Sequence, residues 1–251
     1  MKIVRSLMVA SSLLVAGQVQ AATVTPADIA NQIAATKQTA YTGLTQDLAA
    51  AAWMNPSNSA EPHSAGIIPV GVQVGIEVAG LEIDPNATHW SLMGITDSTL
   101  PLPRVRLSVG IPFGLDVGYM KMNASGLDLT GYEVRMAFGN YIPVPMLEAN
   151  VRYHTSTLSV TDAADGIEVK NSGFAAMIGA NLPIVKPYIE FGTVQSTSTG
   201  SGAFSGLTEL DASNTTTALG AKIEFAFIVI NAEMAKVGDK KLTNVKLGFE
   251  F

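Results

Sequence analysis

The sequence predicts an all-β fold: a transmembrane antiparallel up-and-down β-barrel of about ten strands preceded by an N-terminal helix. Three observations predict it. An export signal opens the chain, apolar side chains alternate with small or polar ones from residue 69 onward, and short connections alternate with longer ones. The composition excludes a disordered chain, because only 14% of the residues are charged and the mean hydropathy is +0.29.

Residues 1–21 are expected to be a secretory signal peptide. Lys2 and Arg5 supply the positive start, residues 7–16 form the apolar centre, and Val19-Gln20-Ala21 is a small-residue cleavage site. The apolar centre is about half the length of a membrane span, and no later apolar run approaches the roughly 20 residues that a spanning helix needs. We therefore expect export without a helical anchor, and localisation in the cell outer membrane.

Residues 22–68 are expected to be a helix or plug segment followed by a linker. Thr25-Pro26-Ala27-Asp28 has the form of a helix start, apolar residues then recur at helical spacing as far as Ala52, and Asn55-Pro56 ends the pattern. Two interpretations stay open. The helix rests on the periplasmic mouth of the barrel, or it lies inside as a plug.

Residues 69–251 are expected to form the barrel, with segments long enough for tilted membrane strands. Connections at 111–114, 140–144, 183–185 and 225–227 are short. Those at the other end are longer, with 81–102 and 195–214 the longest and 123–125, 157–166 and 238–241 between and after them. Short periplasmic turns and longer outward loops are typical of outer-membrane barrels. A soluble barrel or sandwich, which also alternates, is the competing interpretation. The ten alternating segments are residues 70–79, 104–111, 115–119, 132–138, 147–153, 174–180, 189–191, 219–225, 228–234 and 245–251.

The last segment, residues 245–251, alternates and stops on Phe251. It resembles the final strand of Gram-negative outer-membrane β-barrel proteins. The resemblance implies that Phe249 and Phe251 act as an assembly signal, and that outer-membrane lipids and the barrel assembly machinery are partners.

A second resemblance concerns Ala40-Tyr41-Thr42-Gly43, Asp47 and Trp53-Met54-Asn55-Pro56. These residues are similar to the N-terminal hatch of the long-chain fatty-acid transporter family. The resemblance implies hatch-gated uptake of a hydrophobic small molecule, which we keep as an alternative function.

If the bulky apolar residues of each strand face lipid, the residues that alternate with them, which include most of the charges, face the lumen. The acids and bases among them are nearly balanced, whereas an ion-selective pore would show one dominant sign. We therefore expect paired charges in a narrow lumen, and a non-enzymatic protein with a structural or small-solute transport role. The expected lumen residues are Glu77, Arg104, Arg106, Asp116, Glu133, Arg135, Glu148, Arg152, Glu190, Lys222, Glu224, Glu233, Lys246 and Glu250.

One constellation points to a different chemistry. His154 and Ser156 share a strand face and Glu168 follows across a turn, and a base, a hydroxyl and an orienting acid are what acyl transfer needs. The arrangement resembles the His-x-Ser and later Glu of outer-membrane lipid A deacylases, although Thr157 stands where that family has Asn. An outer-leaflet lipid acyl hydrolase is thus a further alternative.

No cofactor or metal is expected. The chain has no Cys, and its three histidines are not at metal-ligand spacing. A net charge of −6 without basic clusters excludes nucleic acid as a partner. The sequence leaves the oligomeric state open.

Overall fold

The computed structural model describes residues 34–63, 70–124, 126–162 and 165–251. The expected signal peptide, the expected helix start at residues 25–28 and residues 64–68 of the expected linker lie outside this part of the chain.

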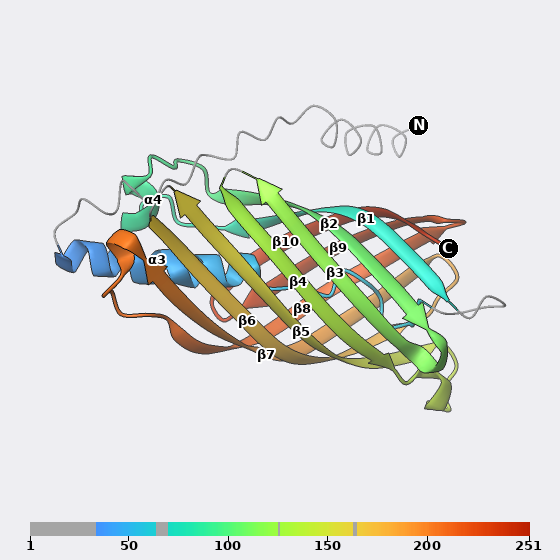
Figure 1. The fold of residues 1–251 in the computed structure, drawn as a ribbon. Helices are drawn as coiled ribbons and strands as arrows, with labels where there is room; N and C mark the ends of the chain where they lie inside the picture. Colours follow the sequence, from blue (N-terminus) through green and yellow to red (C-terminus); the bar gives the residue numbers. More distant parts are fainter. Residues whose placement is uncertain (1–33, 64–69, 125, 163–164) are drawn as a thin grey trace, which may run out of the picture.

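The described strands form one closed antiparallel barrel, in which each strand pairs with its neighbours in sequence and β1 pairs with β10 (Figure 1). At the closure, Val74 lies opposite Phe249 and Val78 opposite Val245. The predicted fold class, a ten-stranded up-and-down barrel with an N-terminal helix, is confirmed. The strands are β1 (Gly71–Glu82), β2 (Thr99–Ile111), β3 (Leu115–Ala124), β4 (Leu127–Ala137), β5 (Leu147–Asp162), β6 (Asp165–Ala180), β7 (Val185–Ser201), β8 (Asp211–Phe225), β9 (Ile228–Val237) and β10 (Lys240–Glu250).

The barrel has a loop end and a C-terminal end. The loop end carries residues 83–98, with helix α4 (Thr88–Leu92), and residues 202–210, with the short helix η3 (Gly202–Phe204). The C-terminal end is the opposite one, where β1 begins and β10 finishes. The expectation that connection length separates strictly by end is wrong. Residues 238–239 form a tight turn at the loop end, and residues 138–146 are a longer connection at the C-terminal end.

The barrel is apolar outside and charged inside over its C-terminal half. Successive strand residues point to opposite faces, so in β1 the Ile76 side chain faces out and is 54% exposed while Glu77 faces in and is 0% exposed. A soluble barrel would have the opposite arrangement, with an apolar interior and a polar surface. An exposed belt of apolar side chains around a polar interior is the surface of a membrane-embedded barrel.

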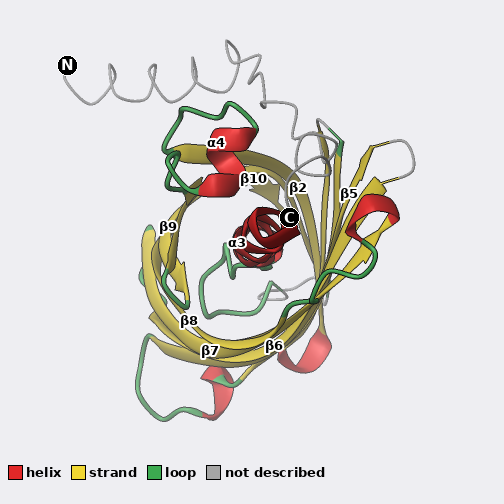
Figure 2. Ribbon diagram, turned by 90° about the vertical axis from the view of Figure 1, so that its left-hand side faces the viewer, coloured by secondary structure: helices red, strands yellow, loops and turns green. Residues whose placement is uncertain are grey.

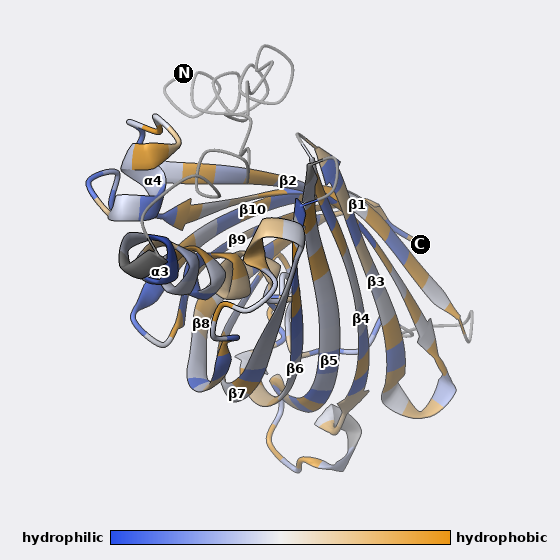
Figure 3. Ribbon diagram, turned by 60° about the vertical axis from the view of Figure 1, so that its left-hand side comes forward, coloured by the Kyte–Doolittle hydropathy of each residue, from blue (hydrophilic) through white to orange (hydrophobic). Residues whose placement is uncertain are grey.

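This polarity reverses towards the loop end. In β5, Val151 and Tyr153 face outward, but the outward positions that follow are Thr and Ser, while Leu158 and Val160 are buried inside. Corresponding inward residues of the other strands build one apolar core at the loop end. Figure 3 shows blue and orange mixed along the strands rather than uniform bands. The strands therefore extend beyond the apolar belt.

This reversal explains why the predicted loops are too long. Residues 157–166 are expected to be a connection but belong almost wholly to β5 and β6, and β2 and β7 extend into the expected loops 81–102 and 195–214. Outward apolar residues mark only the part of each strand that faces lipid. Hydrogen bonding between the strands continues beyond that part, towards the loop end.

Helix α3 (Ala34–Ala52) lies inside the barrel (Figure 2). Its N-terminal part is at the loop end, where the Gln38 side chain accepts a hydrogen bond from the Thr208 amide at 2.9 Å. The chain then continues through the lumen to His63, whose amide donates to Asp116 at 3.2 Å near the C-terminal end. We call residues 34–63 the plug. In the described part of the chain, no helix is long and apolar enough to cross a membrane.

Candidate functional site: the plug and the barrel wall

The upper plug packs into the apolar core of the loop end. Tyr41, Leu44 and Leu48 of α3 are buried there against inward residues of the strands. The Tyr41 ring stacks on Phe204 of η3 with centroids 5.8 Å apart. Burial of each large apolar side chain contributes about 1.5–3 kcal/mol. Apolar packing therefore stabilises α3 in this position.

Asp47 joins α3 to α4 and to the start of β10. It accepts hydrogen bonds from His89 Nε2 at 2.8 Å and Trp90 Nε1 at 2.7 Å, and it forms an ion pair with Lys240 at 2.5 Å. Burial alone would raise the pKa of Asp47, but His89 and Lys240 outweigh it and hold this pKa below its ordinary value. Gly43 permits the approach, because a Cβ there would lie 2.6 Å from His89 Nδ1.

The C-terminal end of α3 is satisfied by the wall. The last carbonyls of a helix have no partner within the helix and carry partial negative charge. Arg104 donates to the carbonyl of Ala51 at 2.5 Å, and Ser156 donates to that of Ala52 at 2.5 Å. The helix thus ends on polar groups that the strands supply.

Asn55 is the central contact below the helix. Arg104 and Arg106 donate to its side-chain oxygen at 2.9 and 2.8 Å, and its amide nitrogen donates to Glu233 at 3.0 Å. Glu233 also accepts from the Ser57 amide at 3.1 Å and from the Tyr188 hydroxyl at 2.6 Å. Among the described residues, Glu233 has no ion pair with a base. Three hydrogen bonds stabilise this buried carboxylate in place of a counter-charge, and two of them come from the plug.

Charged groups hold the lower plug. The Glu61 carboxylate lies 2.9 Å from Lys222 Nζ and 2.8 Å from Lys186 Nζ. Burial would raise the pKa of Glu61, but the two ammonium groups outweigh it and hold the pKa below its ordinary value. His63 contacts Asp116 at 3.1 Å, yet burial, together with the neighbouring Arg135, lowers the pKa of His63.

Other charges pair within the wall itself. Arg152 Nε lies 2.7 Å from Glu190 and Arg152 Nη1 lies 3.0 Å from Glu133, and the guanidinium stands 5.9 Å from the Trp53 ring centre. Glu77 pairs with Arg104 at 3.3 Å and Arg106 at 2.5 Å.

The structure places all fourteen expected lumen residues on the inner side of the barrel or at its C-terminal rim. Eleven are buried, and Glu148, Glu224 and Glu250 are partly exposed at the rim. Glu250 pairs with Lys222 at 2.8 Å, Lys186 pairs with Glu224 at 2.6 Å, and Lys246 donates to Gln73 at 2.5 Å. No ion pair is recorded for Glu148 among the residues described.

Sequence reasoning missed the plug's own polar residues and most neutral wall partners. Several of the missed wall residues occupy inward positions of the same strands as the charges, so strand parity alone could have found them. Lys186 has the parity of Glu190 in β7, but nothing in the pattern marks Glu61. The missed residues are Asn55, Ser57, Asn58, Glu61, His63, Gln73, Asn150, Asn171, Lys186, Tyr188, Asn231 and Asn244.

The three residues of the hydrolase alternative do not come together. His154 and Ser156 face inward and are buried, but the Ser156 hydroxyl is bonded to the plug and no hydrogen bond to the His154 ring is recorded. Glu168 points to the outer side of β6 and pairs with Lys170 at 2.7 Å. In β6 the odd-numbered residues point into the barrel, so residue 168 points outward. The hydrolase hypothesis did not take this alternation into account.

The expected assembly-signal residues lie on the outer surface at the C-terminal end. Phe249 is 44% and Phe251 71% exposed, and both rings stack on Phe227 with centroids 6.1 and 6.3 Å apart. Within the described ranges, no group of three or more His, Cys, Asp or Glu is placed to hold a metal ion.

Two small cavities border the plug at its ends. One of about 250 Å³ lies beside Gln46 and Lys240 at the loop end, and one of about 150 Å³ lies beside Glu61 and Glu250 at the C-terminal end. Between them, the plug residues 40–60 are buried except at Thr42, Gly43 and Gln46.

No family model and no curated protein matches the sequence. Among solved structures, Ail of Yersinia pestis, the attachment invasion locus protein, is 14% identical, with a TM-score of 0.36 over 72% of this chain and 97% of that one. The N-terminal β-barrel domain of Pseudomonas aeruginosa OprF is 12% identical, with a TM-score of 0.33 over 71% and 97%. OmpT, an outer membrane protein of Vibrio cholerae, is 15% identical, with a TM-score of 0.30 over 72% and 64%. Likenesses of this strength concern the type of fold, and we draw no functional argument from them.

Proposed function

We propose that this protein is an outer-membrane β-barrel closed by its own N-terminal plug, with a structural rather than a conducting role. Support for the membrane placement comes from the exposed apolar belt around a charged interior and from the exposed aromatic residues at the C-terminal end. The closed lumen is supported by the burial of the plug over most of its length.

The observation that carries the proposal is the pairing of plug and wall. Glu233, Arg104 and Arg106 each form hydrogen bonds with plug atoms. Removing one partner of a buried charged hydrogen bond costs about 1–3 kcal/mol or more. Withdrawal of the plug would break many such bonds together with the apolar contacts of α3, so the plug is an integral part of the folded barrel.

Single-channel recording of the refolded chain 22–251 in a planar bilayer tests the closed lumen. We expect no steady conductance from protein that shows the heat-modifiable gel shift of a folded barrel. A variant lacking residues 34–63 is expected to conduct if it shows the same gel shift. Ohmic steps from the intact chain would overturn the proposal.

A second candidate, gated passage of a small polar solute, is favoured by one observation. Below Asn55 the plug forms no helix or strand, and it is held mainly by hydrogen bonds and ion pairs. Salt weakens ion pairs to the extent that they are exposed, and the partly exposed pairs are those of Glu224 and Glu250 at the C-terminal rim. Voltage- or salt-induced openings that reverse on return to the starting condition would support this candidate. Permanent silence would support the structural role.

The remaining alternatives have separate tests. Unchanged lipid acylation in cells carrying Ser156→Ala would remove the hydrolase. Hatch-gated uptake of a hydrophobic molecule requires room in the apolar core, which α3 occupies. Uptake by cells that carry the intact chain, and its loss after Leu48→Glu, would restore that alternative.

A further inference from the structure

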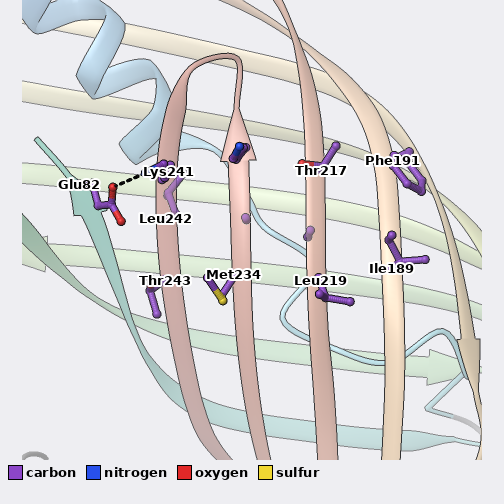
Figure 4. Close-up of a pocket in the computed structure, with 12 residues that line it drawn as sticks. Glu82, Ile189, Phe191, Thr217, Leu219, Met234, Lys241, Leu242 and Thr243 are labelled. Carbon is purple, nitrogen blue, oxygen red and sulfur yellow. Dashed lines mark ion pairs between the residues drawn. The ribbon is translucent and has the colours of Figure 1, made fainter.

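The outer face of β7 to β10 has an apolar depression that ends in two lysines towards the loop end (Figure 4). Its volume is about 350 Å³. In Figure 4, Met234, Leu219 and Ile189 lie along the lower part, and the ion pair of Glu82 with Lys241 lies above them. We call this site the lysine-capped groove, defined by Ile189, Phe191, Leu219, Met234, Lys236 and Lys241.

The two lysines bring an excess of positive charge to one place. Lys241 of β10 lies directly opposite Lys236 of β9, and Thr217 of β8 lies opposite Lys236 on its other side. Like charges directly opposite each other destabilise a sheet. Glu82 lies 3.2 Å from Lys241, but no ion pair is recorded for Lys236 within the described chain.

Other outward lysines near the loop end differ in this respect. Lys121 pairs with Asp128 at 2.5 Å, and Lys170 pairs with Glu168 at 2.7 Å. Their charges are neutralised by neighbouring side chains, whereas the cap of the groove has two bases and one acid. Charge complementarity therefore calls for an anion at Lys236 and Lys241.

The position of the cap indicates which anion. Outward side chains on one side of it, Met234 and Leu219, are apolar, and those towards the loop end are polar or charged. The lysines thus stand where the apolar belt ends, at the level of lipid headgroups.

We propose that the lysine-capped groove binds a phosphate-bearing anionic lipid. The phosphate lies between the ammonium groups of Lys236 and Lys241, within reach of the Thr217 hydroxyl, and an acyl chain lies along Leu219, Met234 and Ile189. The proposal rests on the membrane placement proposed above, and it adds a specific ligand to it.

Native mass spectrometry tests the site, using the refolded chain 22–251 in detergent with equal amounts of diphosphorylated lipid A and phosphatidylcholine. We expect selective retention of lipid A, reduced roughly thirtyfold in the double variant Lys236→Gln/Lys241→Gln, because each of the two lysines near the membrane surface contributes about 1 kcal/mol. The matched control Lys121→Gln/Lys170→Gln loses the same charge and is expected to retain lipid A as the wild type does. Met234→Trp narrows the groove without altering its charge and is expected to lower retention.

Three outcomes would overturn the proposal: equal retention by the lysine and control variants, no preference for lipid A over phosphatidylcholine, or displacement of the lipid by inorganic phosphate. Insertion of each variant into phosphatidylcholine vesicles is measured in parallel. If the wild type does not insert, the membrane placement itself is wrong. If all variants insert but retention follows none of the substitutions, only the lipid site is wrong.

Discussion

Glu233 shows how a single wall residue depends on the plug. Its buried carboxylate is stabilised by Asn55, Ser57 and Tyr188 rather than by a base. We predict that Glu233→Ala lowers the free energy of unfolding by about 1–3 kcal/mol, because the donors lose their acceptor, and that Glu233→Gln, which keeps one acceptor oxygen, costs less. Urea unfolding followed by fluorescence checks this, with Trp53 in the lumen as reporter in a Trp90→Phe background. Equal losses for the two variants would contradict the prediction.

His154 presents the opposite case. Its ring is buried against Trp53, with centroids 6.4 Å apart, and neither ring nitrogen has a hydrogen-bond partner recorded. An unsatisfied buried polar group costs about 1–3 kcal/mol. We therefore predict that His154→Leu leaves stability unchanged or raises it, measured by the temperature of the heat-modifiable gel shift. A clear loss of stability would contradict the prediction.

At the scale of elements, α3 and α4 depend on one carboxylate. The pKa of Asp47 is held below its ordinary value, so its contribution to stability is fully present above the unfolded pKa of about 4 and is lost as the pH falls through the folded pKa. We predict that acidification below about pH 4 releases α4 before the barrel unfolds. Trp90 fluorescence in a Trp53→Phe background measures this. In Asp47→Asn, α4 is expected to be loosened already at neutral pH, with no further change on acidification.

The elements also show how far sequence reasoning reaches. The alternation at Val72, Val74 and Ile76 predicted β1 and its outward face, because lipid contact imposes a repeat of two. The same rule fails beyond Tyr153, where outward Thr and Ser replace the apolar set and residues 157–166 resemble a loop. The inward charges of the wall could be assigned from their odd or even positions in each strand. Their partners in the plug could not, because Asn55 and Glu61 lie in a segment whose path is set by tertiary contacts.

For the whole molecule, the direction of the plug has a topological consequence. The N-terminal part of α3 is at the loop end, while β1 begins at the C-terminal end. If the loop end faces outward, residue 37 is accessible from the cell surface. The chain has no native Cys, so we predict that Lys37→Cys and Asp239→Cys react with a membrane-impermeant maleimide on intact cells. Tyr141→Cys, at the other end, is expected to react only after the outer membrane is permeabilised. Labelling of Lys37→Cys only after permeabilisation would place the plug in the reverse direction.

The barrel closed by β1 and β10 encircles the plug, which belongs to the same polypeptide. Because β10 follows residues 34–63 and the other described strands in the chain, the barrel can close around the plug only if the plug is already in place. Otherwise the plug must be threaded through the closed barrel afterwards. The first order of events avoids forcing Trp53 and the buried charges past the wall. In that case the pairing of β10 with β1 closes the barrel around a plug that is already bound to the other strands.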